Sequence, residues 1–135
     1  MTRIESEAVN VGAPRTEVFA FLSDMNNIRH LLPADRISDW KSDADQCSFK
    51  VQNAYTITLV KNGSTPNESI TWVSGKGAPF EFDLVATLSD ADAATRGQLV
   101  CNARINPFLE MMVKTPLKNL FDYMARQLQK RYETA

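Results

Sequence analysis

The last part of the chain carries a long apolar stripe with the spacing of a helix. From Phe108 onward, hydrophobic residues recur at steps of three and four positions, which places them on one face of an α-helix. The stripe consists of Leu109, Met112, Val113, Leu117, Leu120, Phe121, Met124 and Leu128. Pro116 lies within it and removes a backbone hydrogen bond. We therefore expect a kink or a break there, with residues 108–115 as a separate leading piece.

The middle of the chain alternates between apolar and polar residues, which is typical of strands with one buried and one wet face. Five runs show this alternation: 47–51, 55–59, 70–72, 80–88 and 98–105. Turn-forming residues separate the runs at 43–45, at 62–64 with Pro66, at 75–79 and at 90–92. This spacing predicts consecutive hairpins, and therefore an antiparallel meander.

The first part of the chain predicts one strand followed by two short helices. Residues 3–11 form the strand, and Pro14 suits the first turn of a helix because it has no N–H to leave unpaired. Asp24 is placed to cap the second helix, and Pro33 ends it. No internal repeat, low-complexity tract or linker interrupts the chain. We therefore expect a single domain over residues 1–135.

This order of elements, and some local sequence, resembles the helix-grip fold of the START-like or SRPBCC superfamily. The matching segments are Pro14-x-x-x-Val18-Phe19-x-Phe21-Leu22-Ser23-Asp24-Met25, then Leu32-Pro33, and Gly75-Lys76-Gly77 before the next strand. The superfamily includes birch-pollen allergens, polyketide cyclases and lipid-transfer START domains, and this sequence resembles small bacterial members of the polyketide cyclase and birch-pollen-allergen-like group. It implies an α+β fold in which a seven-stranded antiparallel sheet, with six strands after the helices, wraps around the long C-terminal helix. It also implies a hydrophobic cavity between the sheet and that helix.

Composition narrows the classes of partner. With 15 basic and 16 acidic residues the chain has a net charge of −1, which argues against nucleic acid as a partner because polyanion binding needs excess Lys and Arg. No apolar run approaches the roughly 20 residues of a membrane span, so no stable membrane insertion is expected. The first residues contain no apolar segment of a secretory signal, and Cys47 and Cys101 lack metal-ligand spacing. We expect a cytoplasmic protein with reduced, buried thiols, no metal and no cofactor.

The main candidate site is the cavity that the resemblance implies. The alternation of the strands and the stripe of the helix both predict which side chains point into it, and the methionines among them adapt to irregular ligands. The predicted cavity residues are Phe49, Tyr55, Ile57, Trp72, Phe82, Leu84, Leu99, Cys101, Ala103, Met112, Leu117, Phe121 and Met124. The alternative is that these side chains close the space and form only a core.

The polar residues are weaker candidates for a catalytic or binding site. His30 is the single histidine and could act as a general base, but no nucleophile or second carboxylate is placed near it, which favours a surface histidine. Glu81 and Asp83 alternate with apolar residues, which places them on the wet face of the sheet, and cross-strand pairs explain Asn102 and Arg104 there. We therefore predict no catalytic residue.

Three functional hypotheses remain at this point. The first is a non-enzymatic carrier or sensor that binds a small hydrophobic molecule, such as a lipid, a polyketide or an aromatic compound. The second is an enzyme of the polyketide cyclase or dehydratase type that uses Tyr55 or His30 as acid and base. The third is a partner-binding domain that acts through its sheet surface or as a homodimer, and a sealed interior with an exposed apolar patch would favour it.

Overall fold

The computed structural model describes residues 2–51, 55–75, 80–92 and 94–133. Residues 76–79 of the turn predicted at 75–79 and the side chain of Tyr55 lie outside the described part. The described elements, in chain order, are β1 (Thr2–Glu5), β2 (Val9–Val11), α1 (Arg15–Ser23), the short 3₁₀ helix η1 (Met25–Leu31), β3 (Ile37–Ser42), β4 (Gln46–Val51), β5 (Tyr55–Thr65), β6 (Ser69–Ser74), β7 (Glu81–Ala91), β8 (Ala94–Arg104) and α2 (Pro107–Arg131).

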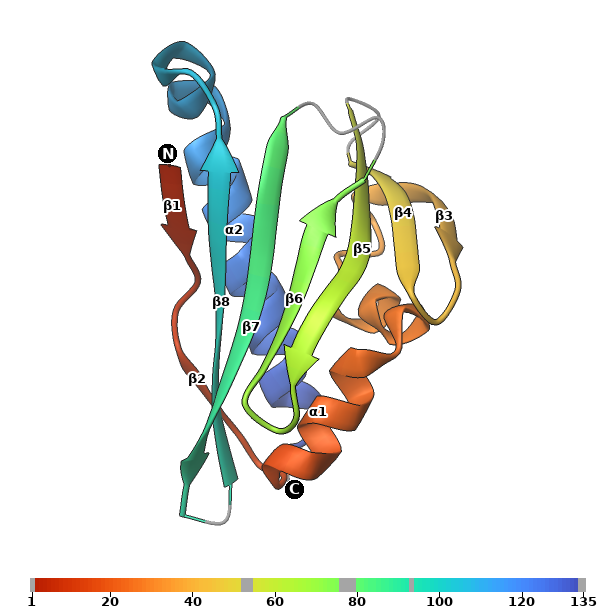
Figure 1. Cartoon of the computed structure of the whole chain (residues 1–135), viewed down its shortest axis with the longest axis vertical. Helices are drawn as coiled ribbons and strands as arrows, with labels where there is room; N and C mark the ends of the chain where they lie inside the picture. Colours follow the sequence, from red (N-terminus) through yellow and green to blue (C-terminus); the bar gives the residue numbers. More distant parts are fainter. Residues whose placement is uncertain (1, 52–54, 76–79, 93, 134–135) are drawn as a thin grey trace.

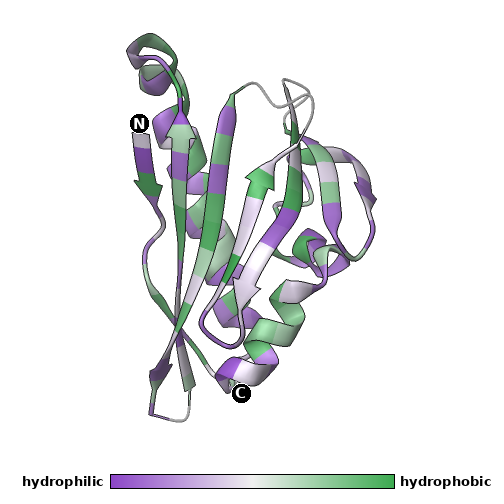
Figure 2. Ribbon diagram, in the orientation of Figure 1, coloured by the Kyte–Doolittle hydropathy of each residue, from purple (hydrophilic) through white to green (hydrophobic). Residues whose placement is uncertain are grey.

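All strands belong to one antiparallel sheet. Its order is β1-β8-β7-β6-β5-β4-β3, and β2 pairs with the other end of β8. The long helix α2 lies across one face of this sheet (Figure 1). Apolar and polar residues alternate along the strands, so one face of the sheet can be buried against α2 (Figure 2). The predicted antiparallel sheet with a long C-terminal helix is confirmed.

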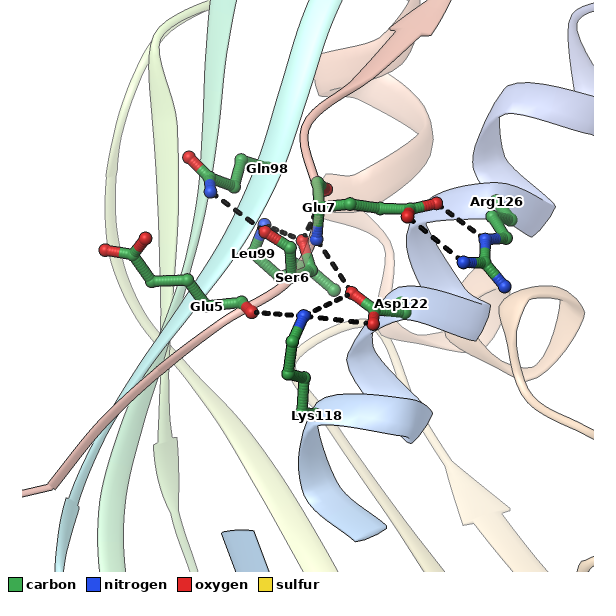
Figure 3. Close-up of polar contacts among 8 residues, drawn as sticks. All are labelled: Glu5, Ser6, Glu7, Gln98, Leu99, Lys118, Asp122 and Arg126. Atoms are coloured by element: carbon green, nitrogen blue, oxygen red, sulfur yellow. Dashed lines mark hydrogen bonds and ion pairs between the residues drawn. The ribbon is translucent and has the colours of Figure 1, made fainter. Parts of the chain in front are cut away.

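The strand predicted over residues 3–11 is divided in two by Ser6. The backbone N–H of Ser6 donates to the carbonyl of Leu99, and the Ser6 hydroxyl oxygen accepts from the Leu99 N–H, each at 2.9 Å (Figure 3). The side-chain amide of Gln98 donates to the Ser6 carbonyl at 2.9 Å. Because a side-chain oxygen here replaces a backbone partner, β1 and β2 pair with β8 as two separate segments. The prediction of one continuous strand is therefore wrong.

The two short helices follow the prediction. In α1 the buried residues are Val18, Phe21 and Leu22, which follow one another at helical spacing. Asp24 caps η1 as expected, since its carboxylate accepts from the backbone N–H of Asn26 at 3.0 Å. η1 ends at Leu31, two residues before Pro33.

Two irregular stretches depart from simple alternation. Strand β3 has no clear alternation because its register shifts between Ser38 and Lys41, where Asp39 has a φ of 54°. Residues 62–64, which we expected to form a turn, instead form a bulge within β5. Gly63 adopts a φ of 97° there, which only glycine adopts at little cost. The chain turns at 66–68 instead, where Asn67 has a φ of 62°.

Helix α2 is continuous through Pro116, so the predicted separate piece at 108–115 is wrong. Asn106 caps the helix by accepting from the Leu109 N–H at 2.8 Å, and Pro107 occupies its first turn. The helix therefore begins well before Pro116, and a single missing hydrogen bond does not end it. Figure 1 shows the first turns of α2 extending past the end of β8. Within the described chain, no helix is both long and apolar enough to cross a membrane.

Replacing Pro116 with alanine should stabilise the protein. Alanine restores the backbone hydrogen bond and relieves the clash with the preceding turn, and the loss of proline's stiffness in the unfolded chain offsets part of this gain. We expect the free energy of unfolding, measured by urea denaturation, to rise by about 2 kcal/mol. Thr115→Ala, at the exposed neighbouring position, is the control and should change it by about 0.5 kcal/mol or less. Equal stabilities for Pro116→Ala and the wild type would show that residues 107–115 do not hold the helix in solution.

Candidate ligand pocket

An apolar pocket lies between the sheet and α2, and we call it the outer pocket. Phe49 lies opposite Ile57 across β4 and β5, and Leu84 lies opposite Cys101 across β7 and β8. Residues directly opposite one another point to the same face, so these four side chains reach the pocket together. The eleven side chains that line it are Phe49, Ile57, Leu59, Phe80, Phe82, Leu84, Cys101, Leu117, Leu120, Phe121 and Met124.

A second apolar pocket, which we call the inner pocket, lies further along the same helix. Trp72 and Leu99 line it from the sheet, Leu22 and Leu31 line it from α1 and η1, and Leu128 lines it from α2. Met124 is the one residue that lines both pockets among those the structure describes. Each pocket has a free volume of about 20 Å³, which is room for about one water molecule. Side chains therefore fill most of the interior in this conformation.

The structure brings together most of the predicted cavity residues. The outer pocket contains eight of them: Phe49, Ile57, Phe82, Leu84, Cys101, Leu117, Phe121 and Met124. The inner pocket contains Trp72 and Leu99, together with Met124. That these residues bind a ligand stays a prediction.

Two predicted residues, Met112 and Ala103, lie outside both pockets, and a third, Tyr55, is not described. Met112 is 61% exposed, so its inward placement is wrong, because the first turns of α2 extend past the sheet that would cover them. Ala103 is fully buried but lines neither pocket. The side chain of Tyr55 is outside the described residues.

Sequence reasoning missed three residues of the outer pocket. Leu59 and Phe80 have the same strand parity as Ile57 and Phe82, and Leu120 is three residues after Leu117 on the helical stripe. The signal was therefore present in the pattern. Phe80 and Phe82 also contact each other, with ring centroids 5.8 Å apart.

The polar candidates lie away from both pockets. His30 is exposed on η1. On the outer face of the sheet, Asp83 accepts from the Asn102 amide at 3.0 Å, and Glu81 pairs with Arg104 at 3.2 Å. Cross-strand pairing therefore accounts for these four side chains, as predicted.

A polar cluster attaches α2 to the segment between β1 and β2 (Figure 3). Asp122 accepts from the backbone N–H of Glu7 at 2.7 Å and from the Lys118 ammonium at 3.1 Å. Arg126 donates two hydrogen bonds to the Glu7 carboxylate, at 2.6 and 3.0 Å. The Arg126 guanidinium lowers the pKa of Glu7, and Glu7 in turn raises the pKa of Arg126. This cluster holds the middle of α2 against the sheet edge, while the helix residues before Leu117 have no comparable attachment among the described contacts.

Large apolar side chains are exposed at the start of α2. Phe108 is 75% exposed and Met111 is 84% exposed, and Met112 lies beside them. They precede Leu117 and Leu120, which line the outer pocket. An apolar surface therefore lies close to one end of the pocket along the helix.

Solved structures share this fold, although the sequence comparisons find no relative. No protein-family model matches the chain, and no curated protein matches it in sequence. XoxI from Bacillus cereus is similar with a TM-score of 0.77 at 11% identity, over 98% of this chain and 96% of that one. A START superfamily protein from Mycobacterium smegmatis is similar with a TM-score of 0.74 at 15% identity, over 96% of each chain. The Aha1 dimer from Colwellia psychrerythraea is similar with a TM-score of 0.68 at 14% identity, over 98% of this chain and 97% of that one.

Proposed function

We propose that this chain, which has a START-like helix-grip fold, binds a small hydrophobic molecule between its sheet and α2. The observation that carries the proposal is the outer pocket, whose eleven lining side chains are all apolar. Burial of apolar ligand surface there would contribute about 25 cal/mol per Å². A carrier or a sensor of such a molecule needs no catalytic group.

The ligand has to displace side chains in order to enter. The free volume of about 20 Å³ is far below the roughly 300 Å³ of a typical small-molecule site. The side chains that yield most easily are Phe80, Phe82 and Leu120, which are only partly buried, and Met124, whose unbranched side chain has three rotatable bonds. Binding therefore proceeds through an opened conformation, and its affinity is lowered by the cost of opening.

A partner-binding domain is the second candidate, favoured by one specific observation. The interior is nearly filled, and Phe108, Met111 and Met112 form an exposed apolar surface on α2. A second copy of the chain or another protein could cover that surface. Nothing among the described residues favours a cyclase or dehydratase reaction: His30 is exposed on η1, Glu81 and Asp83 form cross-strand pairs on the outer face of the sheet, and the side chain of Tyr55 lies outside the described residues.

Two buried thiols provide a matched test of the outer pocket. Cys101 lines it, whereas Cys47 is equally buried, at 1% exposure, but lines neither apolar pocket. Leucine at either position overpacks the interior and should cost about 1–3 kcal/mol of stability. Only Cys101→Leu should also narrow the pocket. We expect Cys101→Leu to weaken binding of α-methylstyrene, a small apolar probe, by about tenfold or more, and Cys47→Leu to leave it within about twofold.

Binding is measured by NMR titration of the methyl resonances, and both variants are first checked for cooperative unfolding. Equal affinities in Cys101→Leu and Cys47→Leu would contradict the outer pocket as the binding site. Native mass spectrometry of gently purified protein then tests for a natural ligand. A protein that binds neither α-methylstyrene nor anything from its source would favour the exposed surface of α2 as the functional site.

A further inference from the structure

Trp72 carries a buried polar group that has no partner among the described residues. This residue is fully buried in β6, and its backbone lies between Lys61 of β5 and Leu84 of β7. Among the described residues, its indole Nε1–H finds no hydrogen-bond acceptor. Buried polar groups are nearly always hydrogen-bonded, so an unpaired buried donor needs an explanation.

The walls of the inner pocket, which Trp72 lines, offer little to hold a water molecule. Most of the pocket is aliphatic or methionine side chain, including Leu22, Leu99 and Met124. Its lining includes two polar residues, Gln98 and Thr87, which alternate along their strands with the buried Leu99 and Leu88. Their side chains donate to main-chain carbonyls: Gln98 Nε2 to Ser6 at 2.9 Å and Thr87 Oγ1 to Gln98 at 3.3 Å. A buried water typically makes about three hydrogen bonds, and a water here would depend mainly on the indole. An acceptor on a bound ligand explains the unpaired donor better.

We propose that the inner pocket binds the polar end of the ligand, and that Trp72 Nε1–H donates to an acceptor oxygen on it. This inference rests on the proposed function and extends it, because Met124 lines both pockets and its displacement would let one molecule occupy both. Among the residues that the structure describes, no cationic side chain lines either pocket, so an ionised carboxylate or phosphate would be buried without a counter-charge from them. The ligand class is therefore a neutral apolar molecule with a carbonyl, ester or ether oxygen.

Two probes of the same shape test this inference. Acetophenone and α-methylstyrene differ only in a carbonyl oxygen replaced by a methylene group, so the ratio of their affinities reports on that oxygen. Trp72→Phe removes the indole N–H and keeps an aromatic ring. We expect the preference for acetophenone over α-methylstyrene to fall about tenfold from wild type to Trp72→Phe. Desolvation of the carbonyl affects both proteins equally and cancels in this comparison.

A second measurement uses the wild-type protein alone, in case Trp72→Phe does not fold. The chain has two tryptophans, and the indole of the other, Trp40, donates to Ser42 Oγ at 3.0 Å. Trp40→Phe therefore assigns the two indole resonances of ¹⁵N-labelled protein. Acetophenone should move the Trp72 indole proton downfield, as a newly formed hydrogen bond does, and α-methylstyrene should not.

The outcomes separate the inference from the proposed function. A tenfold loss of preference, or a downfield shift with acetophenone alone, supports the hydrogen bond from Trp72. Binding of both probes with an unchanged preference and no selective shift overturns the role of Trp72 and leaves the apolar site in place. Failure of both probes to bind the wild-type protein, together with the absence of a natural ligand in native mass spectrometry, overturns the proposed function and the inference with it.

Discussion

Replacing Met124 with alanine should lower the free energy of unfolding by about 2–5 kcal/mol, the range found for buried methionine or leucine truncations. Met124 is 2% exposed and is the side chain shared by the outer and inner pockets. Its removal loses apolar burial and leaves a cavity that joins two spaces already present. Urea denaturation, with the slope checked for two-state behaviour, measures the loss.

The same substitution should strengthen ligand binding while it weakens the fold. The opening that the wild-type protein has to undergo is partly completed in Met124→Ala, so α-methylstyrene should bind more tightly than it does to the wild type. Met124→Leu conserves most of the volume and should cost less than about 1.5 kcal/mol. Met111→Ala, on the same helix but 84% exposed, should stay within about 0.5 kcal/mol. A cost for Met124→Ala no larger than that for Met111→Ala would show that Met124 does not fill the interior.

The pattern of apolar positions predicted the fold and most of the pocket lining because both depend on simple periodicity. Ile57 and Leu84 could be assigned to the buried face because successive strand residues alternate between faces. Leu117, Phe121 and Met124 could be assigned to the face of α2 that packs against the sheet, because they recur at steps of four and three residues. Assigning such residues to the buried face requires only the assumption that the chain has one core.

The predictions from sequence were wrong where the structure depends on a specific side-chain hydrogen bond, on a bulge, or on how far a helix extends beyond the sheet. The hydroxyl of Ser6 pairs with the Leu99 N–H and divides the first strand, which no alternation reveals. Gly63 forms a bulge where its sequence context resembles a turn. Met112 belongs to the helical stripe, yet the first turns of α2 extend past the end of β8 and Met112 is left 61% exposed.

The free volume was beyond sequence reasoning for a different reason. Which residues face the interior follows from their positions, but the space left between them depends on packing to within a methyl group. The pocket residues were therefore largely predictable, while the filling of the pocket by Phe121, Met124 and their neighbours was not. The unpaired indole of Trp72 is equally invisible in the sequence, because the partners of a side chain are set only by the tertiary structure.

Burial of Cys47 and Cys101 should make both thiols slow to react with thiol reagents. Burial raises the pKa of Cys47 to about 12, and a backbone hydrogen bond with Leu59 offsets a part of that rise. Burial also raises the pKa of Cys101 to about 12, with a further contribution from the negative charge of Asp83. The stability gained by keeping these thiols neutral is fully present below the unfolded pKa of about 8.5 and is lost as pH rises toward 12.

Both thiols should therefore react with a disulfide reagent at pH 8 at least about a hundredfold more slowly in the folded protein than in urea, because burial keeps them protonated and out of contact with the reagent. Cys47→Ala and Cys101→Ala assign the two rates, and absorbance of the released thiolate follows them. Cys101 lines the outer pocket, so the pocket opening that the proposed function requires should expose Cys101 without exposing Cys47. Cys101 should then be labelled faster than Cys47, and saturating α-methylstyrene should slow its labelling. Labelling of both residues at one shared rate, unaffected by the probe, would mean that the thiols are exposed only by global unfolding and that the pocket does not open by itself.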